Sequence, residues 1–343
     1  MTALEDFSGL WRDELALCGI SEGDVVAALS DGSKTTQLYE QALLMAAHEL
    51  GASPFVVTVL PLGTKDSGES GSPTRTPLTG NPGAIEALQT ADLVVDLVFL
   101  LFSPEQTAIL DSGARMLLCL EPIDCLTRLF PTREQRRRVE VGEQLLADAK
   151  VLRFTNPAGT DVTYQLGDFG FLAEYGYTDI PGRWDHWPSG FVAACPNEGA
   201  VEGRVVLAPG DIIFPFKSYV KEPISLQIEG GRIVDIRGGY EADLLSDFVA
   251  SFEDEDAYGI SHIGWGLNEK ARWSSLLADP RSYGMEARAF YGNVLFSTGP
   301  NSEFGGTNFS ACHLDIPMHG CSLFLDDEQI VCDGDVVIDD MKA

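Results

Sequence analysis

The first 150 residues alternate short apolar runs with longer segments of helical periodicity, and this alternation restricts the fold more than any other feature. Apolar residues recur at helical spacing in Leu4–Cys18 and Thr35–Leu50, and a glycine follows each segment as a stop. The predicted strands are Asp24–Leu29, Phe55–Leu60, Asp92–Phe99 and Met116–Leu120. Short apolar strands separated by helices predict a mostly parallel sheet with helices on its faces.

The pattern changes after about residue 150, where helical periodicity largely disappears. One helix is expected near Ala242–Phe252, and the end of the chain is strand-rich. We therefore predict the α/β class, with an N-terminal, mostly parallel α/β domain over residues 1–150 and a β-rich α+β domain over residues 151–343. The short strands expected early in the second domain, punctuated by Gly and Pro, are Val151–Thr155, Val162–Leu166, Val192–Ala194, Val205–Leu207, Ile212–Pro215, Ser225–Ile228 and Arg232–Arg237.

The charge balance argues against two classes of partner. The chain has 23 Lys and Arg against 52 Asp and Glu, a net charge of −29. Such a surface repels phosphate backbones and anionic lipids, so neither nucleic acid nor a membrane surface is an expected partner. The most apolar stretch, Leu93–Phe102, is far shorter than the roughly 20 residues of a membrane helix and contains Asp96.

The cysteines and the N-terminus favour a cytoplasmic location. Seven cysteines, an odd number without a CxxC pair, are typical of reduced thiols rather than of a disulfide framework. The sequence MTALEDF shows no basic region followed by an apolar run, so no secretory signal is expected.

One long segment, Leu62–Gly83, consists mainly of Gly, Ser, Thr and Pro and reads as a loop without a core. It is either a tolerated surface insertion or a functional element, a lid or a subunit contact. A homo-oligomer is the expected assembly.

Several common catalytic motifs are missing from the sequence. His48 lies in HELGA, where Ala52 occupies the position of the second histidine of a zinc-binding HExxH motif. The chain has neither the GxSxG of a nucleophile elbow nor the GxxxxGK[ST] of a phosphate-binding loop.

Two short motifs hold residues that could bind a metal. His313 and Asp315 are two apart in ACHLDIPM, and residues at i and i+2 of a strand project to the same face. His262, in SHIGWGLN, is the third candidate. Two histidines and one carboxylate can occupy one face of an octahedral metal and leave positions open for substrate and O2, as in non-haem Fe(II) sites. A zinc hydrolase with the same ligands, or a hydrogen-bonded surface pair, is the alternative.

A second feature is the aromatic segment Glu174–Trp187 (EYGYTDIPGRWDHW). Its Trp and Tyr residues alternate with charged side chains and with His186, which suits a flat, polar aromatic ligand held by stacking and hydrogen bonds. The alternative is a loop whose aromatic residues seal the edge of the second domain's core.

An ordered set of segments resembles the M29 (thermophilic aminopeptidase-like) metallopeptidases over most of residues 150–320. The segments are RFTNPAGTDVT, WPSGFVAACPNEGAVEG, HIGWGLN and GGTNFSACHLD. Those peptidases carry a metal-binding Glu where this chain has Phe191, and a second Glu where it has His262. Their two-metal site depends on such carboxylates, so the resemblance implies that the second metal site is lost.

The remaining ligand set is similar to that of the 2,5-dihydroxypyridine 5,6-dioxygenases, a family built on the same scaffold. This resemblance implies one Fe(II) per subunit, bound by His262, His313 and Asp315. It implies conversion of 2,5-dihydroxypyridine and O2 to N-formylmaleamate in nicotinate-type pyridine degradation. A single-metal M29-like aminopeptidase or amidase, and a non-enzymatic protein with a decayed site, remain alternatives.

Residue types near these motifs indicate further roles. His186 and Glu174 are the candidates for the catalytic base and the ring anchor. We expect the iron on the inner wall of the second domain, with the first domain covering it near Leu100–Glu105. The substrate-binding candidates are Ser302, Asn308 and Ser310, which shortly precede His313 in the sequence.

Overall fold

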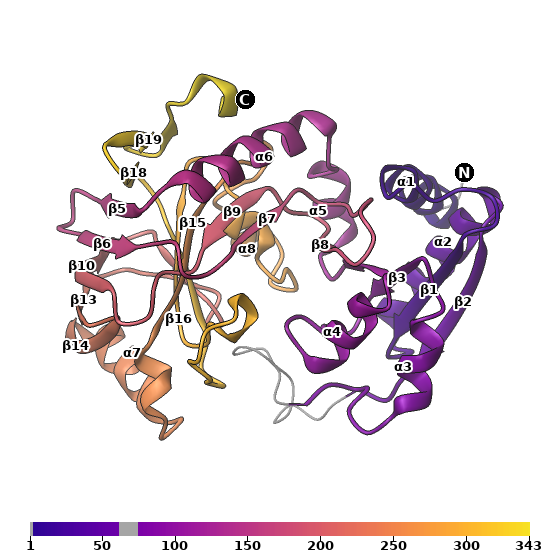
Figure 1. The fold of residues 1–343 in the computed structure, drawn as a ribbon, viewed down its shortest axis with the longest axis horizontal. Helices are drawn as coiled ribbons and strands as arrows, with labels where there is room; N and C mark the ends of the chain where they lie inside the picture. The colour runs from indigo at the N-terminus through magenta and orange to yellow at the C-terminus, as the bar shows by residue number, and fades with distance from the viewer. Residues whose placement is uncertain (1–2, 62–74) are drawn as a thin grey trace.

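The computed structural model describes residues 3–61 and 75–343 (Figure 1). They form two five-stranded sheets, one eight-stranded sheet and a two-stranded hairpin. Most of the Leu62–Gly83 loop lies outside the described residues, so its role as lid, subunit contact or insertion stays a prediction. Within the described ranges, no helix combines the length and the apolar character that crossing a membrane would require.

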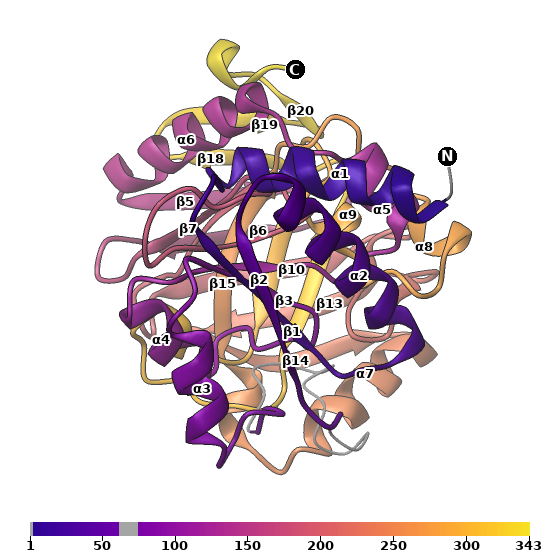
Figure 2. The same ribbon diagram turned by 90° about the vertical axis from the view of Figure 1, so that its right-hand side faces the viewer.

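The first five-stranded sheet is parallel throughout, in the order β2-β1-β3-β4-β8. Helices α1 (Ala3–Leu17) and α2 (Lys34–Glu49) cover one face, and α3 (Pro82–Leu88) and α4 (Pro104–Asp111) cover the other (Figure 2). Both faces are therefore buried, which explains why the central strands read as continuous apolar runs. The predicted α/β class is confirmed. The strands are β1 (Val25–Ser30), β2 (Ser53–Thr58), β3 (Leu93–Asp96), β4 (Arg115–Leu118) and β8 (Trp184–His186).

Strand β8 comes from a much later part of the chain than its neighbours. It pairs in parallel with β4, with Met116 opposite Trp184 and Leu118 opposite His186. Three residues are too few for a strand pattern to be recognisable in the sequence. Strand β8 therefore joins residues of the second predicted domain to the sheet of the first. The division into domains 1–150 and 151–343 stays a prediction.

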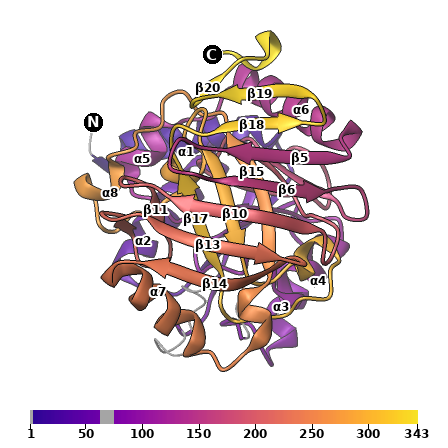
Figure 3. The ribbon, with the colours of Figure 1, turned by 90° about the vertical axis from the view of Figure 1, so that its left-hand side faces the viewer.

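The rest of the chain is mainly antiparallel. The eight-stranded sheet has the order β14-β13-β10-β6-β5-β18-β19-β20, and the second five-stranded sheet has the order β17-β16-β15-β9-β7. Strands of the two sheets cross, one sheet in front of the other (Figure 3), and Phe154 packs against Phe296 between them at 6.5 Å.

The bounds of the remaining elements are as follows. The eight-stranded sheet contains β5 (Val151–Thr155), β6 (Asp161–Gln165), β10 (Val201–Leu207), β13 (Ile224–Glu229), β14 (Arg232–Gly238), β18 (Ser322–Leu325), β19 (Glu328–Cys332) and β20 (Asp335–Val336). The second five-stranded sheet contains β7 (Phe171–Glu174), β9 (Phe191–Ala194), β15 (Ile260–Gly266), β16 (Val294–Thr298) and β17 (Leu314–Met318), and the hairpin contains β11 (Ile212–Ile213) and β12 (Ser218–Tyr219). The other α-helices are α5 (Ile123–Arg128), α6 (Arg133–Asp148), α7 (Tyr240–Ala250), α8 (Ser275–Ala278) and α9 (Met285–Arg288).

The order of the parallel strands creates a crevice at one edge of that sheet. Strands β2 and β3 lie on opposite sides of β1, so the connections after β1 and β3 lead away from each other. Ligands of open α/β sheets bind at such switch points, outside the carboxyl ends of the strands. Asp31 follows β1 and Leu97–Phe102 follows β3, and Asp31 and all of that segment except Leu100 line the cavity described below.

Candidate active site

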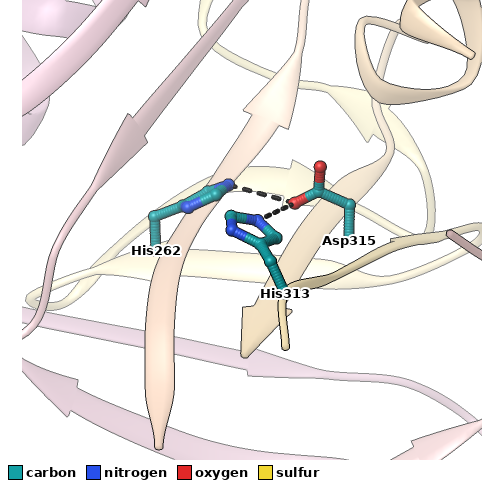
Figure 4. A group of neighbouring side chains, drawn as sticks. All are labelled: His262, His313 and Asp315. Carbon is teal, nitrogen blue, oxygen red and sulfur yellow. Dashed lines mark hydrogen bonds and ion pairs between the residues drawn. The ribbon is translucent and has the colours of Figure 1, made fainter. Parts of the chain in front are cut away.

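The three predicted metal ligands converge on the second five-stranded sheet (Figure 4). His262 lies on β15, Asp315 lies on β17, and His313 immediately precedes β17. Asp315 Oδ1 lies 3.1 Å from His313 Nε2 and 3.3 Å from His262 Nε2. One possible ligand atom from each residue lies within 4.8 Å of the others, so the three can reach one ion.

A strand irregularity turns His262 toward the other two ligands. Strand β16 separates β15 from β17, and the register of β15 with β16 shifts between Ile260 and Ile263. The two residues between them, Ser261 and His262, therefore face the single residue Ser297 of β16. Such bulges re-aim side chains beside functional sites.

Ser297 lies between two of the candidate ligands. Its hydroxyl donates a hydrogen bond to Asp315 Oδ1 at 2.5 Å and lies 2.8 Å from His262 Nε2. Ser297 was not among the residues predicted from the sequence. The available signal was a pair of polar side chains, Ser297 and Thr298, at the end of the apolar run VLF.

Arg288, from α9, fixes the other oxygen of Asp315. Its Nε donates to Asp315 Oδ2 at 2.6 Å, and its guanidinium lies 4.1 Å from the centre of the Phe214 ring. Burial alone would raise the pKa of Asp315, but the charges of Arg288 and His313 outweigh it and hold this pKa well below its usual range. Asp315 is therefore an anionic ligand at neutral pH. No local sequence pattern pointed to Arg288.

The donor set fits a single transition-metal ion. Two imidazoles and one carboxylate suit a divalent metal with open positions for other molecules. Phe191, which the resemblance to the M29 peptidases matches to a metal-binding Glu, is buried among Ala193, Met285 and Leu295. In residues 3–61 and 75–343, this is the single group of three or more His, Cys, Asp or Glu side chains with converging ligand atoms.

A cavity of about 320 Å³ lies in front of the three ligands. Its second wall comes from the parallel sheet and includes Leu101 and Phe102, within the Leu100–Glu105 stretch expected to cover the site. Asp96 shapes this wall by accepting hydrogen bonds from the Val98 and Leu100 amides at 2.8 and 2.6 Å. Burial raises the pKa of Asp96 to about 6 despite these bonds.

Glu174 and His186 both line the cavity. Ser189 Oγ donates to Glu174 Oε2 at 2.9 Å, and burial, followed by the negative charge of Asp185, raises the pKa of Glu174 well above its usual value. His186 Nε2 is buried and has no hydrogen-bond partner in the part of the chain that the structure describes. Burial, followed by the charge of Arg288, lowers the pKa of His186 to about 3, so the ring is neutral at pH 7.

The other aromatic residues of Glu174–Trp187 have packing roles. The Tyr175 ring lies between two guanidinium groups, 4.0 Å from that of Arg183 and 4.7 Å from that of Arg136. Trp187 is fully buried and packs edge-on against Trp11 at 4.9 Å. The segment thus has features of both alternatives, a ligand-binding segment and a packing loop. Glu174 and His186 line the cavity, whereas Tyr175 and Trp187 are buried in packing contacts.

Ser302, Asn308 and Ser310 lie outside the cavity lining that the structure describes. Asn308 Nδ2 donates to the carbonyl oxygens of Gly299 and Asp256, and Ser310 Oγ accepts from the Cys312 amide. Ser302 begins a short 3₁₀ helix that ends at Phe304, and Phe304 itself lines the cavity. Substrate contact by the three polar residues stays a prediction.

Structural comparison defines the class of scaffold. The chain is similar to wild-type AmpT from Thermus thermophilus with a TM-score of 0.62, covering 97% of this chain and 99% of that one. The two sequences are 14% identical, so the likeness establishes a fold shared with the M29 aminopeptidase scaffold and nothing about activity.

Sequence comparison then establishes the family. The chain belongs to the NicX family, 2,5-dihydroxypyridine 5,6-dioxygenase, whose family model matches residues 6–338. It is 53% identical over 264 residues to the 2,5-dihydroxypyridine 5,6-dioxygenase of Pseudomonas putida KT2440, covering 76% of this chain and 75% of that protein. A solved structure of 2,5-dihydroxypyridine dioxygenase from the same strain has a TM-score of 0.95 and 43% identity, with both chains fully covered. The resemblance inferred from the sequence is confirmed.

Proposed function

We propose that this protein is a non-haem Fe(II), extradiol-type dioxygenase that converts 2,5-dihydroxypyridine and O2 to N-formylmaleamate. The observation that carries the proposal is the convergence of His262, His313 and Asp315 on a cavity wall in a chain of this family. Both atoms of O2 enter the product, so no reductant is required. The reaction is a step in the degradation of nicotinate-type pyridines.

One Fe(II) per subunit would be held by the two imidazoles and the Asp315 carboxylate. An ion held there would supply the open positions and the redox chemistry that the reaction of the ring with O2 needs. Arg288 and Ser297 orient the carboxylate through its two oxygens. Such supporting contacts keep ligand geometry fixed.

Glu174 and His186 would manage the substrate's proton and orientation. Loss of the 5-hydroxyl proton raises the electron density of the ring, and a base works best with a pKa near the operating pH. Burial raises the pKa of Glu174, which makes its carboxylate a stronger base, whereas it lowers the pKa of His186 to about 3. We therefore assign Glu174 as the base and His186 as the neutral ring anchor, exchanging the roles expected from the sequence.

The apolar wall would hold the flat ring and exclude water. Phe99, Leu101 and Phe102 line the cavity on the side of the parallel sheet, and Phe304 lines it beside His262. Aromatic and aliphatic walls with a few polar groups are typical of small-molecule sites. A cytoplasmic location and a homo-oligomeric assembly remain part of the proposal.

Oxygen consumption separates this function from a hydrolase. Protein loaded with Fe(II) under anaerobic conditions should consume one O2 for each 2,5-dihydroxypyridine in an oxygen electrode, and His313→Ala should consume none. Mass spectrometry should find a product with the mass of substrate plus O2. Cleavage of an amide or peptide bond without uptake of O2 would contradict the proposal and support an M29-like peptidase or amidase.

A further inference from the structure

A buried carboxylate outside the metal site joins the parallel sheet to the cavity. Glu121 follows β4 and is fully buried. Its Oε1 accepts a hydrogen bond from the Met285 amide at 2.8 Å. Its Oε2 accepts from Ser282 Oγ at 2.7 Å and from the Tyr283 amide at 3.1 Å. One side chain thus holds three donors of a segment that is more than 160 residues away in the sequence.

The segment that Glu121 holds, Ser282–Arg288, contributes directly to the site. Tyr283, Met285 and Arg288 all line the cavity. Arg288 Nη1 donates to the Tyr283 carbonyl at 2.9 Å, and Arg288 Nε donates to Asp315 Oδ2. A continuous series of hydrogen bonds therefore runs from Glu121 through Tyr283 and Arg288 to the candidate metal ligand Asp315.

Close packing limits the alternative positions of this segment. Gly284 has φ +94°, and a Cβ at that position would lie 2.2 Å from the Phe214 ring. The Phe214 amide donates to the Asp315 carbonyl at 2.9 Å. A displacement of Tyr283 or Met285 would therefore be transmitted to both the guanidinium of Arg288 and the strand that carries Asp315.

An independent contact keeps the segment attached when Glu121 is changed. Glu286 is buried, and its Oε2 accepts from Arg128 Nη2 of α5 at 2.8 Å. Its Oε1 accepts from the Arg272 amide at 2.5 Å. These contacts of Glu286 do not involve Glu121. A Glu121 variant is therefore expected to fold with the Ser282–Arg288 segment still attached, but with its orientation less tightly fixed.

We propose that Glu121 is a positioning residue for the metal centre, acting through Tyr283 and Arg288 on Asp315. The expected change in kcat rests on the proposed function, whereas the expected change in the spectrum rests only on metal binding by the three candidate ligands. Burying a carboxylate costs free energy unless its hydrogen bonds are made. Here two of the three donors, the Tyr283 and Met285 amides, belong to residues that line the cavity. Small displacements of a catalytic arrangement lower turnover on the order of 10-fold to 100-fold.

A double-mutant cycle tests this route. The variants are Glu121→Gln, which keeps the size of the side chain and loses one acceptor oxygen, Arg288→Gln, and the double variant. The readouts are kcat and KM with 2,5-dihydroxypyridine, and the visible absorption bands of each protein with Co(II) bound. Asp92→Asn is the matched control, since Asp92 accepts the Val25 amide at the opposite end of the same sheet.

Glu121→Gln should lower kcat about tenfold and shift the Co(II) bands, and Asp92→Asn should do neither. In the Arg288→Gln background, replacing Glu121 should have little further effect, because interacting residues are not additive. Additive effects, or unchanged Co(II) bands in Glu121→Gln, would overturn the proposal. Ser282→Ala, which removes one of the three donors, should give a smaller shift in the same direction and tests the route if Glu121→Gln folds poorly.

The proposed function and the positioning role of Glu121 can be contradicted independently of each other. If the wild-type protein does not oxidise 2,5-dihydroxypyridine, the proposed function is wrong, and the Co(II) bands still decide whether Glu121 orients the ligands.

Discussion

The carboxylate of Asp315 has different partners at its two oxygens. Oδ2 is paired with Arg288, whereas Oδ1 faces both histidines and the Ser297 hydroxyl. This division leaves Oδ1 as the oxygen shared with the imidazoles. Asp315 therefore combines a fixed orientation with a negative charge, both of which a metal ligand requires.

We predict one metal ion per chain, bound through these residues. His313→Ala and Asp315→Ala should each lose the ion, because two remaining ligands bind a divalent metal weakly. His48→Ala is the control, since His48 is exposed on α2 and should not affect binding. Elemental analysis of the purified proteins measures the content, and two ions per chain would contradict a mononuclear site.

Glu174 and His186 are predicted to affect turnover and not metal binding. Glu174→Gln and His186→Ala should retain iron and lower kcat, because a positioned base or anchor contributes typically 10²–10⁴-fold. Steady-state kinetics on iron-loaded protein, with metal content measured in parallel, provides the test. Normal kcat in both variants would limit these residues to a packing role.

His186 should also make stability depend on pH. Its pKa is about 3 in the folded protein and about 6.5 in the unfolded chain. As pH falls below 6.5 the unfolded chain binds a proton first, so stability is lost at about 1.4 kcal/mol per pH unit until about pH 3. Between pH 6.5 and 5 this amounts to about 2 kcal/mol.

Urea unfolding of metal-free protein at pH 7 and pH 5 measures this effect. His186→Gln should lose less stability than the wild type over the same interval. An identical loss in the two proteins would show that the imidazole is not kept neutral by the fold.

At the scale of elements, the sequence was informative where the determining interactions are local. The i and i+2 spacing of His313 and Asp315 predicted that both side chains point the same way. Their ligand atoms do lie close together, although His313 lies just before β17 and not on it. The helical spacing of residues 4–18 and 35–50 predicted α1 and α2 to within a residue or two. Such patterns depend on neighbours along the chain, which the sequence displays directly.

Features created by long-range pairing could not be predicted in the same way. The bulge at Ser261–His262 is a property of the pairing between β15 and β16, in which two residues of β15 face Ser297 of β16. Arg288 reaches Asp315 through a four-residue helix that has no sequence pattern of its own. Strand β8 depends on a partner, β4, about 70 residues earlier. In each case the partner, not the local sequence, determines the position.

The junction between helices and β8 is predicted to be important for stability. Trp187 follows β8, is fully buried, and packs against Trp11 of α1 and Phe130 at 4.9 and 6.0 Å. Trp187→Ala should lower the free energy of unfolding by about 3–5 kcal/mol. Tyr240→Ala, at a side chain that is 72% exposed, should change it by less than about 0.5 kcal/mol. Urea unfolding compares the two, and equal losses would contradict this packing argument.

For the whole molecule, the charge of −29 raises the question of how a substrate reaches the cavity. A neutral hydroxypyridine experiences little long-range repulsion, since exposed charges are screened beyond roughly 8–10 Å at physiological salt. The value of KM should therefore change less than about twofold with ionic strength. A steep dependence, with fold and iron content unchanged, would indicate a charged substrate instead.

The parallel sheet and the second five-stranded sheet form the candidate site together. The three candidate ligands lie on β15 and at β17, whereas the facing wall follows β1 and β3. Glu121 and Arg128 connect the two parts by holding the segment that carries Arg288. The geometry of the candidate metal site therefore depends on both halves of the chain.

The origin of the oxygen atoms in the product distinguishes a dioxygenase from a hydrolase most directly. Iron-loaded protein is supplied with 2,5-dihydroxypyridine and isotopically labelled O2 in unlabelled water, and the product is analysed by mass spectrometry during the first turnovers. We expect two labelled oxygen atoms in each product molecule, and no product from His313→Ala or Asp315→Ala. A product whose new oxygen comes from water would contradict a dioxygenase and indicate hydrolysis at this site.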